Sequence, residues 1–243
     1  PRWLKRLDER VTYESLEAAT SEKTKMIVIN SPNNPVGYVL GEKELNEIAE
    51  FARAHNLLVL SDEIYEKIIY GQNHLSIASL DGMRDRTIII NGFSKTYAMT
   101  GWRIGYAVAP AEIIRGMVKI QQHSVTCAPS ISQFAALAAL INSQECVDEM
   151  VEEFKRRRDV IVKRLNERGL RCVNPEGSFY VFANTSNYGN DGEFTERLLR
   201  EVYIIVTPGS AFGHAGKDYV RFSFATSMEN IVEGMKRIEA LLG

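Results

Sequence analysis

The sequence of 243 residues has only three cysteines, four histidines and no strong excess of charge of either sign. The cysteines are odd in number, far apart and without a C-x-x-C pair, so we expect neither a disulfide framework nor a zinc site. The histidines lack the spacing of metal ligands, and we expect no bound metal. A reducing, cytoplasmic compartment is the default expectation for such a chain.

Other features are equally scarce. The formal net charge of −2 gives no electrostatic reason to expect nucleic acid or an anionic membrane as a partner. No apolar run is long enough to cross a bilayer, and residues 1–5 carry no signal-peptide pattern. No G-x-G-x-x-G motif follows an expected strand, so a Rossmann dinucleotide site is not predicted. The chain is nevertheless 45% hydrophobic, which is enough for a substantial core.

The first half of the chain alternates short β-branched runs with amphipathic helical patterns. Near-continuous apolar runs are typical of parallel strands that helices cover on both faces. We predict such strands over residues 26–30, 57–61 and 87–91, and a further strand over 104–109. Helical spacing predicts helices over 42–55, 111–122 and 130–141. This order predicts an α/β fold with a mostly parallel sheet.

The second half follows another pattern. A long amphipathic helix is predicted over residues 144–168, followed by two-residue alternation around 179–183 and 219–225 and a closing helix over 228–242. Such an order is typical of a smaller α+β unit. We place the boundary near residue 143, which gives domains of residues 1–143 and 144–243.

Polar residues that could carry chemistry come at or near the ends of the expected strands, where open α/β sheets bind ligands. Asn34 lies in S-P-N-N-P-V-G after the first strand, a segment that is also consistent with an ordinary loop. Asp62 and Tyr65 lie in S-D-E-I-Y after the second strand. Asp62 could be the counter-ion of a buried cation or the N-cap of a helix.

Two further segments carry cations. Lys95 follows the third strand, and its amine could act as a nucleophile if desolvation lowers its pKa. Arg103, eight positions later, could hold a phosphate with two hydrogen bonds. Arg221 interrupts an apolar strand and could bind a carboxylate. The alternative for all three is an ordinary outward-facing side chain.

Six segments together carry a family resemblance that covers essentially the whole chain. They read N-N-P-V-G, S-D-E-I-Y, G-F-S-K-T-Y-A-M-T-G-W-R-I-G-Y, P-E-G-S-F-Y, T-P-G-S-A-F-G and Y-V-R-F-S-F-A-T-S. In this order they resemble the class I and II aminotransferases of fold type I, enzymes similar to aspartate aminotransferase that use pyridoxal 5'-phosphate (PLP). The resemblance implies part of a PLP-binding large domain followed by a small C-terminal domain.

The resemblance also implies roles around the cofactor ring. Lys95 would bind PLP covalently as a Schiff base and later move a proton at the substrate Cα. Asp62 would pair with the protonated pyridine nitrogen, and a protonated ring is the better electron sink. Asn34 and Tyr65 would hydrogen-bond the phenolic oxygen.

Further roles concern the cofactor phosphate and the substrate. Arg103 would bind the phosphate, with Ser94 nearby. Many relatives have a serine three residues before the lysine, but this chain has Gly92 there, so Ser94 or another group must make that contact. Arg221, with Asn34, would bind the substrate carboxylate.

The implied reaction transfers an amino group from an L-amino acid, aspartate or an aromatic one, to a 2-oxo acid in a ping-pong cycle through pyridoxamine phosphate. A PLP-dependent β-lyase and a non-catalytic binding module of the same fold are the alternatives. The resemblance further suggests a homodimer.

Relatives also carry a substantial N-terminal portion before the first motif found here. That portion supplies sheet strands and a helix N-terminus for the phosphate. We therefore expect this chain by itself to bind PLP poorly, as a truncated product or as a part that a second chain completes.

Overall fold

The computed structural model describes residues 11–243, so the expectation for residues 1–5 falls outside it. The described chain divides into two compact units. The first contains residues 11–32, Val39–Ile69 and Asn73–Val147, and the second contains Asn33–Tyr38, Tyr70–Gln72 and Asp148–Gly243. This division follows packing alone, so the proposed domains, residues 1–143 and 144–243, stay a prediction.

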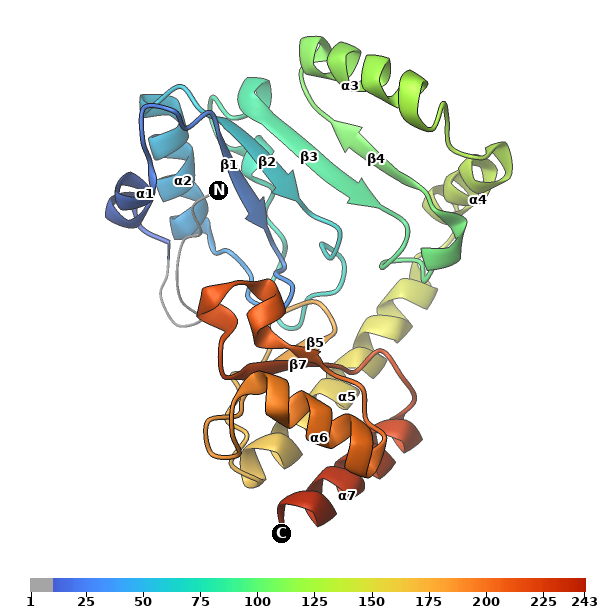
Figure 1. Ribbon diagram of the computed structural model, residues 1–243. Coiled ribbons are helices and arrows are strands. Elements are labelled where there is room, and N and C mark those ends of the chain that lie inside the picture. Colours follow the sequence, from blue (N-terminus) through green and yellow to red (C-terminus); the bar gives the residue numbers. More distant parts are fainter. Residues whose placement is uncertain (1–10) are drawn as a thin grey trace. The chain divides into compact units, whose positions relative to one another are not determined.

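The first unit is built on a four-stranded sheet in the order β1-β2-β3-β4 (Figure 1). Its strands are β1 (Met26–Asn30), β2 (Leu58–Asp62), β3 (Thr87–Gly92) and β4 (Gly105–Val108). The first three run parallel and β4 is antiparallel to β3, which confirms the predicted mostly parallel sheet. The register pairs Asn30 with Asp62, and Asp62 with Ile90. The carboxyl ends of the parallel strands therefore meet at one edge.

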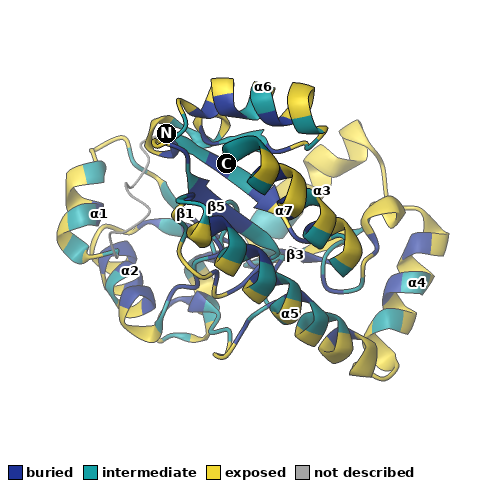
Figure 2. Ribbon diagram, turned by 90° about the horizontal axis from the view of Figure 1, so that it is seen from below, coloured by how far each residue is buried: buried dark blue, intermediate teal, exposed yellow. Residues whose placement is uncertain are grey.

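Helices and short 3₁₀ turns complete this unit. They are α1 (Tyr13–Ala19), α2 (Glu42–Ala54), η1 (Ile77–Ser79), η2 (Arg84–Arg86), η3 (Thr100–Trp102), α3 (Ala111–Ser124) and α4 (Ser130–Ile141). Helix α2 buries Leu45, Ile48, Phe51 and Ala52 on one face and exposes its polar side, as Figure 2 shows. Helical spacing of apolar residues thus positions α2 as predicted.

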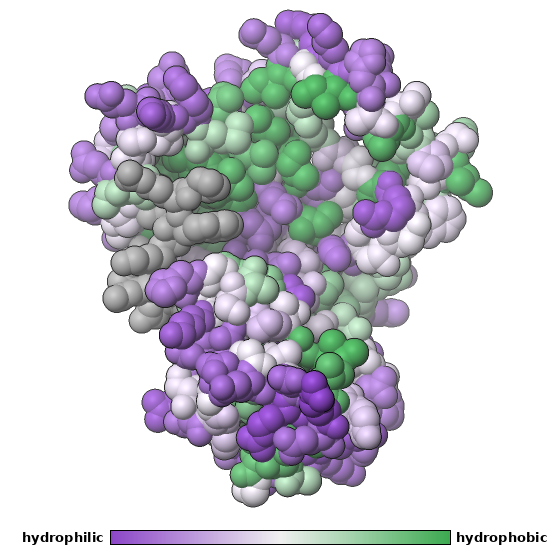
Figure 3. Space-filling view, in the orientation of Figure 1, coloured by the Kyte–Doolittle hydropathy of each residue, from purple (hydrophilic) through white to green (hydrophobic). Residues whose placement is uncertain are grey.

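Part of the first unit exposes apolar side chains. Val28, in the middle of β1, is 67% exposed, and Val108 of β4 is 53% exposed. Helices α3 and α4 expose Ile120 and Phe134. Figure 3 shows hydrophobic surface over the strands of this unit. Grouped apolar exposure is typical of surfaces that bind other proteins or ligands.

The second unit has a three-stranded antiparallel sheet in the order β5-β7-β6. Its elements are β5 (Tyr180–Asn184), α6 (Asp191–Val202), β6 (Thr207–Pro208), η4 (Gly209–Phe212), η5 (His214–Gly216), β7 (Tyr219–Ser223) and α7 (Met228–Leu242). The long helix α5 (Glu145–Glu167) begins in the first unit and continues into the second. The core is apolar, with Phe194, Leu198, Phe224 and Met235 almost fully buried. Across the described residues 11–243, no helix is both long and apolar enough to span a membrane.

Candidate active site

Asp62 ends β2 at the edge where the parallel strands finish. Its carboxylate accepts a hydrogen bond from the Ile64 N–H at 3.2 Å, and its backbone carbonyl accepts one from the Ser31 N–H at 3.2 Å. Burial raises the pKa of Asp62, the Ile64 N–H opposes that effect, and the charge of Glu63 adds to the increase. Such a carboxyl group is suited to accept a cationic partner, because a nearby cation would favour its ionised form.

Lys95 and Tyr65 lie close together in the same unit. The Lys95 Nζ is 6.0 Å from the centroid of the Tyr65 ring. Tyr65 is buried in the turn after β2, and Lys95 lies in the turn after β3, where the Ala98 N–H donates to the Lys95 carbonyl. The turns after two neighbouring parallel strands thus bring the Lys95 amine near the Tyr65 ring, and Tyr65 lies three residues beyond Asp62 in the chain.

The turn that carries Lys95 begins at a close approach between two strands. A Cβ at Gly92 would lie 3.0 Å from the Gly105 Cα and 3.1 Å from the Ile104 carbonyl oxygen. A serine at this position would therefore fit only if the neighbouring backbone moved by a few tenths of an ångström. Glycine here allows the end of β3 to meet the start of β4.

The two predicted phosphate ligands lie on either side of Lys95 in sequence. Ser94 is half-buried, whereas Arg103 is exposed. Arg103 ends η3 in a left-handed conformation with φ of 51°, and its guanidinium donates to the Thr100 carbonyl at 2.9 Å. This geometry assigns no phosphate contact to either side chain, so both roles stay predictions.

Arg221 is the centre of a second group of polar residues, all within the second unit. Its Nη1 donates to Asn34 Oδ1 at 2.8 Å, and its Nη2 donates to Thr207 Oγ1 at 3.2 Å. Its Cζ lies 4.2 Å from the centroid of the Tyr180 ring and 4.9 Å from that of Phe212. Two hydrogen bonds and two aromatic faces hold the guanidinium in place, as recognition of a planar carboxylate requires.

Three of these partners of Arg221 were not predicted from the sequence. Thr207, Tyr180 and Phe212 lie within T-P-G-S-A-F-G and P-E-G-S-F-Y, segments that carried the resemblance without an assigned role. Their location in these motif segments was the one indication in the sequence that they could belong to the site. Their contacts with Arg221 depend on the antiparallel pairing of β7 with β5 and β6, which spacing alone does not indicate.

Asn34 reaches Arg221 because its loop belongs to the second unit. In the segment Asn33–Tyr38, the Gly37 carbonyl accepts hydrogen bonds from the N–H groups of Glu176 and Gly177, at 2.8 and 2.9 Å. The Val36 N–H donates to the Asn33 side chain at 3.1 Å. The loop after β1 is therefore fixed to the segment that precedes β5, which sets the position of the Asn34 amide.

One cluster in the described chain has the composition of a metal site, although no metal was expected. Glu63, Glu66 and His74 each offer a ligand atom, and these atoms lie within 4.8 Å of one another. The Glu63 carboxylate, however, already accepts hydrogen bonds from Ser61, Ser76 and His74. Those three bonds satisfy a buried carboxylate without an ion.

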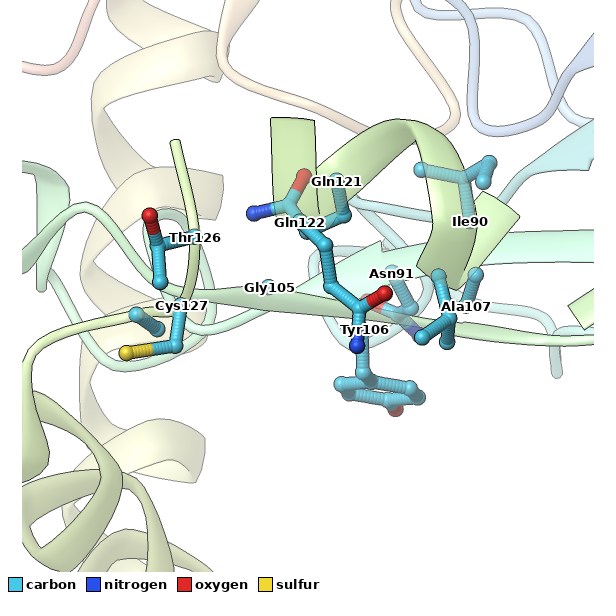
Figure 4. Close-up of a pocket in the computed structure, with 11 residues that line it drawn as sticks. Ile90, Asn91, Gly105, Tyr106, Ala107, Gln121, Gln122, Thr126 and Cys127 are labelled. Atoms are coloured by element: carbon cyan, nitrogen blue, oxygen red, sulfur yellow. The ribbon is translucent and has the colours of Figure 1, made fainter. Parts of the chain in front are cut away.

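A hollow of about 600 Å³ lies between β4, α3 and the segment that follows α3 (Figure 4). Its walls include Asn91, Tyr106, Gln122 and Cys127. Asp62, Tyr65, Lys95 and the other residues singled out from the sequence are not part of this lining. Gly105, which lies against Gly92, does line this hollow.

Comparison with known proteins identifies the family. The family described as aminotransferase class I and II matches residues 3–238. Because this match covers nearly the whole chain, the protein belongs to the class I and II aminotransferase family.

Similar proteins agree with that assignment. The chain is 51% identical over 237 residues to an aspartate aminotransferase of Pyrococcus abyssi and 48% identical over 237 residues to aromatic-amino-acid aminotransferase 2 of Thermococcus litoralis, covering 96% of the chain in each case. It spans 61% of the length of either relative. A crystal structure of the aromatic aminotransferase of Pyrococcus horikoshii superposes with a TM-score of 0.93 at 48% identity, over 96% of this chain and 64% of that one.

Proposed function

We propose that the protein transfers an amino group from an L-amino acid to a 2-oxo acid with PLP as its cofactor. The observation that carries the proposal is the placement of Lys95 Nζ at the ring of Tyr65, on turns that follow neighbouring parallel strands. Family membership supports it. The activities for which the relatives are named favour transfer over β-elimination or a purely binding role.

Residues of the first unit fit two of the three chemical groups of PLP described next, the aldehyde and the ring nitrogen. The cofactor has an aldehyde that an amine can attack, a ring nitrogen that becomes cationic and a phosphate. Lys95 supplies the amine, and Asp62 supplies a half-buried carboxyl whose raised pKa a cationic partner would lower again. When bound, PLP supplies an electron sink for the carbanion at the substrate Cα.

The protein's own side chains then bind, orient and move protons. Asp62 pairs with the ring nitrogen and keeps it protonated. Lys95 anchors the cofactor and afterwards accepts and returns the proton at the substrate Cα. Tyr65 donates a hydrogen bond to the ring hydroxyl. The further cofactor roles that the resemblance assigns to Asn34, Ser94 and Arg103 remain part of the same proposal.

Arg221 binds the substrate carboxylate in this proposal. Asn34, Thr207 and the two aromatic rings preorganise its guanidinium, so little side-chain entropy is lost when the carboxylate arrives. The relatives named for aspartate and aromatic amino acids support these two substrate classes, with a 2-oxo acid as acceptor.

Assembly and location form the last part of the proposal. We propose a homodimer in the cytoplasm. The exposed apolar side chains of Val28, Ile120, Phe134 and Ile141 support association, because burying them against a second copy removes apolar surface from water. Analytical ultracentrifugation of the full-length protein tests this, and a monomer at micromolar concentration would contradict it.

The catalytic proposal is tested by trapping the cofactor. The full-length protein is incubated with PLP, reduced with borohydride, digested and mapped by mass spectrometry. We expect a pyridoxyl group on Lys95 and production of a new amino acid from a supplied 2-oxo acid. Lys95→Arg should abolish both, whereas Lys119→Arg, at an exposed lysine of α3, should change neither. Turnover by Lys95→Arg at the unmodified rate would refute the assignment.

A further inference from the structure

Glu63 follows Asp62 directly but points into the protein. In a strand, alternate residues face opposite sides, so Ser61 and Glu63 share one side and Asp62 takes the other. Ser61 and Glu63 are 2% and 3% exposed, whereas Asp62 is half-buried. A carboxylate so deeply buried is costly unless it is hydrogen-bonded.

Three donors from two chain segments satisfy this carboxylate. Ser61 and Ser76 donate their hydroxyls to Glu63 Oε1 at 3.0 and 2.7 Å. His74 Nε2 lies 2.9 Å from Glu63 Oε2. Burial alone would raise the pKa of Glu63, but the bonds from His74, Ser76 and Ser61 outweigh it and lower that pKa. An ionised carboxylate only accepts, so His74 Nε2 must carry the proton.

Both His74 and Ser76 direct their side chains at the Glu63 carboxylate. Ser76 occupies the N-cap of η1 without making a side-chain cap, and its hydroxyl donates to Glu63. The His74 Nδ1 is buried and has no hydrogen-bond partner among the described residues, an arrangement that costs free energy. The side chain of His74 is directed at Glu63 despite that cost.

Glu63 is also the backbone anchor of the turn that carries Tyr65. Its N–H donates to the Ile90 carbonyl of β3 at 2.9 Å, and its carbonyl accepts from the Glu66 N–H at 2.9 Å. Any rotation of Glu63 about its backbone would therefore move Asp62 on one side and Tyr65 on the other. A side chain locked by three bonds prevents that rotation.

We propose that Glu63 and His74 are positioning residues, which hold Asp62 and Tyr65 at the angles needed to bind the cofactor. This inference rests on the proposed function. Neither side chain touches the reacting atoms, and both act through the backbone of the Asp62–Tyr65 turn. Functional sites commonly depend on such supporting hydrogen bonds.

The test compares two substitutions of His74 in the full-length protein. His74→Leu removes the donor and leaves Glu63 with a buried, less compensated charge, whereas His74→Gln keeps an N–H donor. We measure the dissociation constant of PLP and the absorption spectrum of the bound cofactor. His74→Leu should weaken PLP binding about tenfold, the size of effect typical of lost supporting hydrogen bonds, and should shift the absorption band. His74→Gln should restore both.

The control is His123→Leu, at an exposed histidine of α3, which should change neither quantity. A lower melting temperature of His74→Leu with unchanged affinity and spectrum would overturn the inference and leave a purely structural role. Failure of a folded His74→Gln to restore the spectrum would overturn it as well. If His74→Leu does not fold, Ser76→Ala removes one bond to the same carboxylate, and unchanged PLP binding there has the same consequence.

Failure of the proposed function gives a different result. In that case the unmodified protein yields no borohydride-fixed group on Lys95, whatever the variants do. Failure of the positioning role leaves that group in place, with equal PLP affinity in the unmodified protein and in His74→Leu.

Discussion

Substitution of Gly37 by alanine should destabilise the second unit more than an ordinary glycine replacement. Gly37 has φ of 77°, a conformation that costs an L-residue about 1–2 kcal/mol. A Cβ there would lie 2.5 Å from the Pro175 Cβ and 2.8 Å from the Gly177 carbonyl oxygen. Pro175 has a rigid ring, and Gly177 is held by its own hydrogen bond to Gly37, so neither neighbour can move freely.

The size of the effect follows from two contributions. Forcing extra volume into a packed site costs about 1–3 kcal/mol. Added to the backbone cost, this gives a loss of about 2–5 kcal/mol in the free energy of unfolding for Gly37→Ala. Gly71 offers a matched control in the same unit, because its φ is 94° and a Cβ there would meet nothing within 4 Å. Gly71→Ala should therefore lose only about 1–2 kcal/mol.

Urea denaturation of the three proteins measures these differences. We also expect a functional effect, because the Gly37 loop carries Asn34, which accepts a hydrogen bond from Arg221. Gly37→Ala should raise the KM for the amino acid, whereas Gly71→Ala should leave it unchanged. Equal losses of stability in the two variants would refute this prediction, because they would show that the contact with Pro175 and Gly177 does not constrain the loop.

Three further predictions concern single side chains. Arg221→Ala should lower kcat/KM by an amount that corresponds to about 1.5–3 kcal/mol of lost transition-state binding, the scale of a hydrogen bond to a charged group. Thr207→Val should lower it less. Unchanged steady-state kinetics of Arg221→Ala would remove Arg221 from the site. The pKa of Asp62 is raised above its ordinary value of 3.8 in the folded protein, so ionisation of Asp62 lowers the stability of the fold as pH rises through that range. Asp62→Asn should therefore stabilise the cofactor-free protein at pH 7 while weakening PLP binding. Calorimetry with and without PLP separates the two effects. Tyr70→Phe removes the bond from its hydroxyl to the Ser178 carbonyl and should cost about 1 kcal/mol in denaturant titration; a loss near zero would contradict that role.

Elements with a strong local pattern could be predicted from the sequence, and the errors have specific causes. The strand 26–30 and the helix 130–141 have the predicted bounds. The second strand begins at Leu58 rather than at residue 57, because the Leu57 N–H donates to the Ala52 carbonyl and so ends α2 instead of joining the sheet. It extends to Asp62, since that residue pairs in register with Ile90.

Two α-helices and one β-strand of the described chain were missed, as were its short 3₁₀ turns. Helix α1 has only seven residues and begins at a capping box between Thr12 and Ser15, too short for a clear periodic signal. Strand β6 has two residues and exists only through its pairing with β7, which a local pattern cannot indicate. Helix α6 was predictable, since Asn190 is a good N-cap and Phe194 and Leu198 have helical spacing.

The site residues could be named from motif segments, but their contacts could not. Asn34 and Arg221 are 187 residues apart in the chain and meet through one hydrogen bond. No spacing rule indicates such a pair. The same holds for the aromatic rings around Arg221, because a cation over a ring face depends on how three separate segments pack.

Two adjacent carboxyl groups illustrate why residue type alone does not assign chemistry. Asp62 and Glu63 are neighbours in one strand end, yet the pKa of Asp62 is raised and that of Glu63 is lowered. Burial opposes ionisation of both. Glu63 overcomes it with donors from Ser61, His74 and Ser76, whereas the carboxylate of Asp62 has the Ile64 N–H as its resolved donor. Glu63, whose carboxylate has more hydrogen-bond donors, is therefore suited to a structural role, whereas Asp62, which has fewer, is suited to bind a cationic ligand.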